Sequence, residues 1–190
     1  MNYYNLNAQA FFDGTINVDM VCLYNEFIPL IEKSSFILDA GCGSGRDSKA
    51  FKTLGFRVHA IDASQELAKL AEQQIKQSVQ VTTFQKFDSR VQFDAIWACA
   101  SLLHVPMIDL SVTFKRLADS LKAKGVFYCS FKYGDDEVQS NGRKFTNLNE
   151  SLLQQVISGS FLKISKTWCT SDLRKGREQE KWLNAILIKE

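Results

Sequence analysis

Short apolar runs alternate with segments of helical periodicity along most of this chain. Five of the runs predict strands, at residues 36–40, 57–62, 81–87, 93–100 and 125–131. Between them, apolar side chains spaced three or four positions apart predict helices. The clearest buried helix face, before Gly125, is formed by Leu110, Phe114, Leu117 and Leu121. Strands that alternate with helices are typical of a parallel sheet covered by helices.

Further helices are expected at 18–32, at 45–55 and after Ser64, a residue type that caps helix N-termini. The helix after Ser64 is expected to bury a face formed by Leu67, Leu70, Ala71 and Ile75. A last helix is expected at 148–158. Two strand-like runs follow it, at 161–169 and 182–189, joined by a charged segment. They predict an antiparallel pair at the sheet edge.

The predicted fold class is therefore α/β, a Rossmann-like doubly wound sheet of about seven strands. The sheet is expected to be mostly parallel, with an antiparallel C-terminal hairpin strand and with helices on both faces. A length of 190 residues suits a single domain. Within 1–190 we expect an N-terminal lid and helix (1–34), a ligand-binding core (35–134) and a C-terminal helix and hairpin (135–190).

Composition and charge narrow the class of protein. With 45% hydrophobic and 23% charged residues, the chain has the composition of a soluble globular protein. The formal net charge of +2, without a basic stripe, argues against a nucleic-acid partner. Five dispersed cysteines without a CxxC pair predict reduced thiols, no metal site and a cytoplasmic location. We find no signal peptide and no apolar run of about 18 residues, so no membrane partner is expected. A monomer or weak homodimer is the simplest assembly.

The stretch FILDAGCGSGRDS, residues 36–48, places three glycines directly after the first strand. Gly41, Gly43 and Gly45 suit a turn with positive φ, in which a ligand approaches the backbone at a helix N-terminus. The dinucleotide fingerprint needs a glycine where Arg46 stands, and Asp39 adds negative charge that would repel a pyrophosphate. The pattern therefore favours a nucleotide-like cofactor that lacks phosphate and carries positive charge, a description that S-adenosylmethionine meets.

An acid followed by G-x-G-x-G, here Asp39, Gly41, Gly43 and Gly45, resembles the first motif of the class I S-adenosylmethionine-dependent methyltransferases. The resemblance spans roughly residues 20 to 190 and implies a single methyltransferase domain with a cofactor-binding core at 35–134. Within that family, residues 41–64 are most similar to the tellurite-resistance and thiopurine-type methyltransferases, which act on small molecules.

Later motifs add candidate cofactor contacts. Asp62 ends the second strand, where an acid either accepts hydrogen bonds from ribose hydroxyls or caps the next helix. The resemblance implies that Asp88 binds the adenine amino group, with Phe87 or Ser89 beside the ring; the alternative for Asp88 is an ordinary loop acid. Residues 93–105 resemble the fourth motif of the family, whose backbone faces the methionine portion. The expected cofactor contacts are Tyr4, Asp39, Gly41, Cys42, Gly43, Arg46, Asp62, Ala63, Phe87, Asp88, Ser89, Ala98, Cys99 and Ala100.

Three further features each have two interpretations. The aromatic segment with Tyr3, Tyr4, Phe11 and Phe12 either staples the first helix or folds over the cofactor as a lid. Arg46 either forms a surface salt bridge or reaches the carboxylate of the cofactor. His104 is the candidate catalytic base, and its alternative is a structural histidine.

Basic residues of the late loops suggest the acceptor. The candidate substrate-binding residues are Lys132, Tyr133, Arg143, Arg174 and Arg177. They form either a cationic wall for an anionic acceptor, with Glu180 and Trp182 bracing the second loop, or a solvated charged face. Amino-group methylases of the family often carry an Asp/Asn-Pro-Pro-aromatic tetrad after the fourth strand, but residues 98–101 read ACAS. Oxygen, sulfur, carboxylate and metalloid acceptors remain.

The sequence thus predicts an enzyme that transfers a methyl group from S-adenosylmethionine to a small acceptor by in-line displacement. Two rivals stay open. One is a non-catalytic S-adenosylmethionine-binding module or partner subunit. The other is a nicotinamide-dependent oxidoreductase, which Arg46 and Asp39 disfavour.

Overall fold

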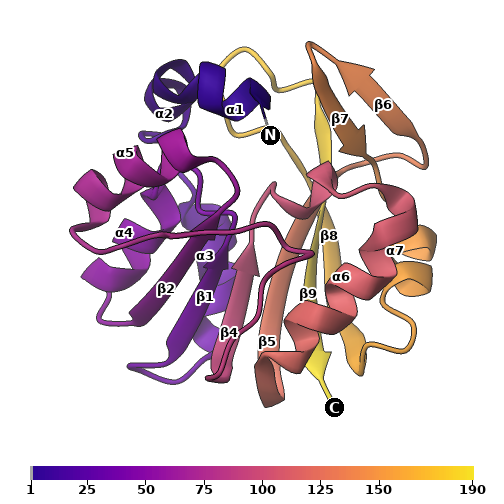
Figure 1. Ribbon diagram of the computed structural model, residues 1–190. Coiled ribbons are helices and arrows are strands. Elements are labelled where there is room, and N and C mark those ends of the chain that lie inside the picture. Colours follow the sequence, from indigo (N-terminus) through magenta and orange to yellow (C-terminus); the bar gives the residue numbers. More distant parts are fainter. Residues whose placement is uncertain (1) are drawn as a thin grey trace.

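The computed structural model describes residues 2–190 and contains a seven-stranded sheet with helices on both faces (Figure 1). Its strands are β1 (Phe36–Ala40), β2 (Arg57–Asp62), β3 (Gln80–Val81), β4 (Phe93–Ala98), β5 (Leu121–Lys132), β8 (Leu162–Ser171) and β9 (Lys181–Lys189). Their order across the sheet is β3-β2-β1-β4-β5-β9-β8. The first five strands pair in parallel, whereas β9 runs antiparallel to both β5 and β8. The predicted fold class is confirmed.

Two apolar layers form because successive side chains of a strand point to opposite faces of the sheet. The helices are α1 (Asn2–Leu6), α2 (Ala8–Thr15), α3 (Val21–Phe27), α4 (Arg46–Thr53), α5 (Gln65–Ile75), α6 (Met107–Asp119) and α7 (Glu150–Val156). On β4, Trp97 packs in the layer that includes α3 and α4, and Ile96 packs in the layer that includes α6 and α7. Among residues 2–190, no helix has the length and apolar character needed to cross a membrane.

The third strand is much shorter than predicted. The prediction was 81–87, but β3 contains only Gln80 and Val81. The chain then turns, because the amides of Lys86 and Phe87 both donate to the carbonyl of Thr83, at 3.0 and 2.9 Å. Phe87 is buried in the apolar layer of α6, so tertiary packing has overridden the β-propensity of this run.

Two predicted helices differ at their ends. The helix expected at 18–32 is α3 followed by a 3-10 turn at Ile28–Leu30, since Pro29 has no N–H to continue the α-helical ladder. Leu121 was expected on the buried face of the sixth helix, but α6 ends at Asp119 and Leu121 begins β5, opposite Phe93.

Three segments form the rim at the carboxyl ends of the parallel strands: helices α1 and α2, the loop between β8 and β9, and a separate hairpin of β6 (Glu137–Ser140) and β7 (Arg143–Thr146) (Figure 1). Neither the helices of residues 2–15 nor this hairpin is among the elements expected from the sequence. The sequence does contain a signal for the hairpin, because Asn141 and Gly142 form an Asn-Gly pair, which favours a tight hairpin turn. Both residues have positive φ, as such a turn requires.

Candidate active site

The glycine turn after β1 exposes bare backbone. Gly41, Gly43 and Gly45 have φ of +85°, +55° and +76°, a region that side chains disfavour. A Cβ on Gly41 would lie 2.5 Å from the Cβ of Ser101. The amides of Gly41 and Cys42 both donate to the carbonyl of Ile61 at 2.9 Å, which fixes the turn against the end of β2.

Asp62 joins this turn to the next helix. Its Oδ2 accepts from the amide of Gly43 and its Oδ1 from the amide of Ser64, both at 2.8 Å. The cap of α5 is the Ser64 hydroxyl, which accepts from the amide of Leu67. Asp62 also lines a cavity of about 370 Å³. Because each carboxylate oxygen has two acceptor positions, Asp62 can still accept hydrogen bonds from a bound diol.

A second cavity of about 150 Å³ adjoins the first on the side of α3 and the β8–β9 loop. The residues that line both cavities are Tyr4, Phe11, Gly41, Gly43, Ala100, His104 and Arg143. We call the larger one the Asp62 cavity and the smaller one the Arg46 cavity. A molecule in one cavity can therefore meet a molecule in the other beside Tyr4 and His104.

Nine of the expected cofactor contacts line these cavities: Tyr4, Gly41, Cys42, Gly43, Arg46, Asp62, Ala63, Cys99 and Ala100. Phe87, Asp88, Ser89 and Ala98 line neither cavity. Residues 82–85 reach the Asp62 cavity in place of 87–89, because β3 ends at Val81 and the chain turns at once. The ring of Phe84 lies 3.3 Å from where a Cβ on Gly41 would be. Phe84 was not predicted, and a lone aromatic after a strand is a weak signal.

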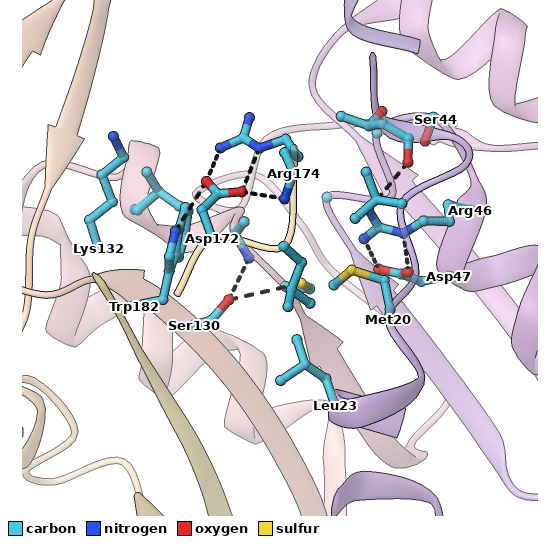
Figure 2. Close-up of a pocket in the computed structure, with 18 of the residues that line it drawn as sticks. Met20, Leu23, Ser44, Arg46, Asp47, Ser130, Lys132, Asp172, Arg174 and Trp182 are labelled. Atoms are coloured by element: carbon cyan, nitrogen blue, oxygen red, sulfur yellow. Dashed lines mark hydrogen bonds and ion pairs between the residues drawn. The ribbon is translucent and has the colours of Figure 1, made fainter. Parts of the chain in front are cut away.

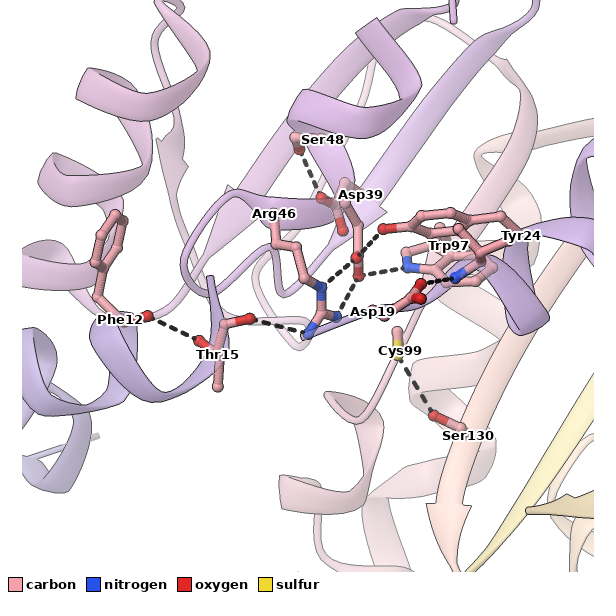
Figure 3. Close-up of polar contacts among 12 residues, drawn as sticks. Phe12, Thr15, Asp19, Tyr24, Asp39, Arg46, Ser48, Trp97, Cys99 and Ser130 are labelled. Carbon is pink, nitrogen blue, oxygen red and sulfur yellow. Dashed lines mark hydrogen bonds and ion pairs between the residues drawn. The ribbon is translucent and has the colours of Figure 1, made fainter. Parts of the chain in front are cut away.

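Asp39 is buried under the turn and lines neither cavity. It accepts a hydrogen bond from the Ser48 hydroxyl at 2.6 Å (Figure 3). Burial, followed by the charge of Asp47, raises the pKa of Asp39 to about 8. The expected repulsion of a pyrophosphate by Asp39 therefore has no support here, since the carboxyl is buried and mostly protonated at neutral pH.

Arg46 forms a buried ion pair instead of a surface one. Its Nε and Nη2 donate to the two carboxylate oxygens of Asp47, at 2.7 and 2.9 Å. Tyr24 and Trp97 donate to the same carboxylate at 2.6 and 2.8 Å (Figure 3). Burial would raise the pKa of Asp47, but Arg46 and these hydrogen bonds hold it below its usual range. Arg46 also lines the cavity that is named after it, and its Nη1 donates to the carbonyl of Thr15 at 3.4 Å.

His104 stands where the two cavities meet. Its Nδ1 lies 3.0 Å from the carbonyl of Lys144, so Nδ1 carries the hydrogen. The Tyr4 hydroxyl, 2.7 Å from Nε2, therefore donates to that nitrogen. Burial lowers the pKa of His104 below its usual value. The imidazole is thus neutral at pH 7, with its only lone pair directed at the lid residue Tyr4.

Helix α2 lies over the glycine turn, and α1 lies beside it. A Cβ on Gly43 would lie 3.2 Å from the ring of Phe11, so this ring sits directly over the turn. The amide oxygen of Asn5 accepts from the Ser64 hydroxyl at 2.7 Å. Together with the bond between Tyr4 and His104, these contacts hold the lid against three elements of the core.

The cationic wall is largely paired with acids. Arg174 forms a two-pronged pair with Asp172, to which the indole of Trp182 also donates at 3.2 Å (Figure 2). Lys132 and Arg177 share Glu180, at 2.6 and 2.7 Å. Lys132, Asp172, Arg174 and Trp182 face Arg46 and Asp47 across the cavity in Figure 2. The predicted residue Tyr133 lines neither cavity and donates to Glu150 at 3.1 Å instead.

The two thiols at the site are not nucleophiles. Burial raises the pKa of Cys42 well above its usual value and that of Cys99 to about 12. Both side chains are therefore protonated at neutral pH and act as small apolar lining.

The chain is similar to known methyltransferases over part of its length. Residues 37–125 match the methyltransferase domain family. A methyltransferase-like protein of Bacillus subtilis, described as the putative methyltransferase YqeM, is 31% identical over 129 residues, which are 59% of this chain and 51% of that protein. A ubiquinone biosynthesis O-methyltransferase of Xanthomonas campestris is 36% identical over 107 residues, 50% of this chain and 41% of that enzyme. The chain thus spans about half the length of these curated relatives, or less.

Solved methyltransferase structures share the fold. The 1,6-didemethyltoxoflavin-N1-methyltransferase of Burkholderia thailandensis, with its acceptor and S-adenosylhomocysteine bound, superposes with a TM-score of 0.75 at 18% identity, covering 99% of this chain and 84% of that one. Magnesium protoporphyrin IX methyltransferase of Synechocystis with S-adenosylhomocysteine gives 0.76 at 15% identity, covering 100% and 97%. The matches support the predicted enzyme class and the predicted cofactor.

The residues that line the two cavities fit S-adenosylmethionine. The Asp62 cavity offers a carboxylate for a ribose diol, and Phe84 and Leu67 offer apolar surface for a base. The Arg46 cavity offers an arginine for a carboxylate. Among the described residues Asp62 has no ion-pair partner, whereas the charge of Asp47 is balanced by Arg46.

Proposed function

We propose that this protein is an S-adenosylmethionine-dependent methyltransferase that methylates a small, anionic acceptor. The observation that carries the proposal is the pair of cavities that meet beside Tyr4 and His104. One has the features of a nucleoside site around Asp62. The other has Lys132, Arg174 and Arg177 on its far wall, with one more positive charge than the acids they contact.

Bound S-adenosylmethionine supplies the electrophilic methyl group, so the protein has to align the acceptor and exclude water. Alignment alone can lower a barrier by about 7–11 kcal/mol. In this proposal the methionine portion of the cofactor extends past Ala100 toward Arg46, and the acceptor enters the opposite side of the Arg46 cavity, where Lys132 and Arg174 lie. Tyr4 and Phe11 close the site from above.

His104 is the proposed proton acceptor where the acceptor group is a hydroxyl or thiol. Its Nε2 carries a lone pair, and its Nδ1 is held by the carbonyl of Lys144. An acceptor hydroxyl would have to replace the Tyr4 hydroxyl at Nε2. A carboxylate acceptor carries no proton and would need no base.

The relatives support a small acceptor of unspecified structure. Their names describe a ubiquinone precursor, a toxoflavin precursor and a magnesium porphyrin as acceptors, which differ widely in structure. The resemblance of residues 41–64 to tellurite-resistance and thiopurine-type enzymes adds metalloid oxyanions and thiols to the candidates.

Calorimetric titration with S-adenosylmethionine, S-adenosylhomocysteine and NAD tests the proposal. We expect both adenosyl compounds to bind and Asp62→Ala to weaken them at least ~100-fold, because two hydrogen bonds to a carboxylate contribute about 1.5–3 kcal/mol each. Asp88→Ala is the matched control. This variant should bind both adenosyl compounds as wild type does, because Asp88 is exposed and lines neither cavity.

The titrations distinguish the methyltransferase from its two rivals. If neither adenosyl compound binds, the methyltransferase proposal is wrong, and NAD binding would then favour the oxidoreductase. If Asp88→Ala weakens binding as Asp62→Ala does, the predicted adenine contact at Asp88 is restored. Binding without methyl transfer to any acid, thiol, phenol or oxyanion would favour a non-catalytic binding module.

A further inference from the structure

Arg143 differs from every other arginine at the site. Arg46, Arg174 and Arg177 each have a carboxylate partner, in Asp47, Asp172 and Glu180. No carboxylate of the described residues lies within ion-pair distance of Arg143, and its Nε is buried without a hydrogen-bond partner. The side chain as a whole is partly exposed, but a guanidinium whose Nε is shielded from water has lost hydration there, and cation–π contacts offset only part of that cost.

The position of Arg143 is central. It starts β7 in the hairpin at the rim and lines both cavities, as His104 does. Its guanidinium carbon lies 4.7 Å from the ring centroid of Tyr3 and 5.0 Å from that of Phe145. The ring of Phe145 also lies 5.1 Å from the imidazole of His104. The unpaired charge is therefore beside the place where the two cavities meet.

The Arg46 cavity beside Arg143 has apolar lining as well as the ion pairs described above. Phe145 and Leu103 line the Arg46 cavity. Trp182 lines it as well, with Met20 and Leu23 on the opposite side (Figure 2). A ligand that fills this space needs apolar surface against these side chains and one anionic group for Arg143. A carboxylate matches the planar guanidinium fork, and as a monoanion it loses less hydration among apolar side chains than a phosphate dianion.

We infer that Arg143 binds the carboxylate of the methyl acceptor, and that the acceptor is an apolar, for example aromatic, carboxylic acid. The inference rests on the proposed function. It assigns Arg143 as the residue that selects the acceptor, while Arg174 and Arg177 hold the β8–β9 loop through Asp172 and Glu180.

Binding of simple acids tests this inference. Benzoate, phenylacetate and indole-3-acetate, each beside its primary amide, and phenyl phosphate are titrated into protein saturated with S-adenosylhomocysteine. Calorimetry or NMR chemical shifts give the affinity. We expect at least one carboxylate to bind, its amide to bind at least ~10-fold more weakly, and Arg143→Gln to weaken the carboxylate by about 10- to 100-fold while the amide is unaffected. Arg90→Gln is the matched control, since Arg90 is exposed and lines neither cavity.

Stability separates ligand binding from a purely structural role. If Arg143 serves only to attach the hairpin to α1 through Tyr3, Arg143→Gln will lower the melting temperature. If Arg143 serves to bind an anionic ligand, Arg143→Gln removes an unpaired charge, and the ligand-free variant will be as stable as wild type or more stable. Arg174→Gln leaves Asp172 buried without its ion-pair partner and should destabilise the protein in either case.

Several outcomes would overturn the inference: no carboxylate of the panel binds, acids and amides bind alike, phenyl phosphate binds more tightly than benzoate, or Arg143→Gln binds acids as wild type does. The same samples report S-adenosylhomocysteine binding. Cofactor binding without Arg143-dependent acid binding contradicts this inference alone, whereas loss of cofactor binding in the wild type contradicts the proposed function.

Discussion

Three aspartates around the glycine turn differ in protonation because their surroundings differ. Asp47 is held ionised by Arg46, Tyr24 and Trp97, despite its burial. Burial raises the pKa of Asp62, although the amides of Gly43 and Ser64 oppose the shift. Asp39 has only the Ser48 hydroxyl as a side-chain partner and lies near the negative Asp47. The same residue type therefore supplies an ion-pair partner, an acceptor for the amides of the glycine turn and a buried neutral acid.

The raised pKa of Asp39 makes stability depend on pH. Its value of about 8 in the folded protein lies above the ordinary 3.8 of the unfolded chain. The folded state therefore holds a proton that the unfolded state releases, so this contribution to stability is present below about pH 4 and is lost as pH rises toward 8. Asp39→Asn mimics the protonated acid, and we expect the variant to be more stable than wild type at pH 8 and nearly equal to it at pH 4.

Urea unfolding at several pH values measures this difference. Glu66→Gln is the control, because Glu66 is an exposed acid paired only with Lys69. A wild-type stability that does not fall relative to Asp39→Asn between pH 4 and 8 would show that Asp39 is ionised in the folded protein.

At the scale of elements, the lid depends on its contacts with the core. Helix α1 has five residues and α2 has eight, lengths at which isolated helices are unstable in water. Their order comes from docking, through Tyr4 on His104, Asn5 on Ser64 and Phe11 over Gly43. Residues that hold the lid thus also line the cavities, so we expect docking of α1 and α2 and binding of a ligand to be linked.

Weakening the lid should speed ligand release. In a Tyr4→Phe, Phe11→Ala double variant, we expect S-adenosylhomocysteine to dissociate about 10-fold faster, because one hydrogen bond and one buried ring are lost. Stopped-flow fluorescence gives the rate. Leu6→Ala, on the same helix as Tyr4 but 75% exposed, should leave it unchanged. Equal rates in the double variant and wild type would mean that helices α1 and α2 do not retain the cofactor.

At the scale of the molecule, the site gathers residues that are far apart in the chain. The cavities are lined from α1, the glycine turn, the ends of β2 and β4, the β6–β7 hairpin and the β8–β9 loop. A ligand that contacts all these segments binds only the folded chain. Its binding free energy therefore adds to the free energy of unfolding.

This linkage predicts a measurable rise in stability. At S-adenosylhomocysteine concentrations of 100 times Kd, the free energy of unfolding should rise by about 2.7 kcal/mol, which corresponds to a rise in Tm of roughly 5–11 °C for a chain of this size. Differential scanning fluorimetry measures the shift, and Asp62→Ala should show little of it at the same concentration. An equal shift in that variant would place the ligand elsewhere.

Local signals in the sequence were enough for the order of elements and for the glycine turn. Hydrophobic periodicity reports burial within a few residues, so the sheet and its antiparallel C-terminal pair were predicted correctly. The positive φ of Gly41 and the acid at Asp62 likewise follow from residue type and the end of a strand. By itself, the sequence therefore determined the fold class and one side of the site.

Long-range contacts decided the rest. Phe84 rather than Asp88 reaches the cavity, because burial of Phe87 turns the chain after two residues of β3. Lys132 is paired because a residue 48 positions later, Glu180, comes beside it across β5 and β9. Arg143 is left unpaired because the hairpin carries it to a place without a carboxylate. The charge state of a side chain depends on the neighbours that folding brings to it, and residue type and periodicity do not specify those neighbours.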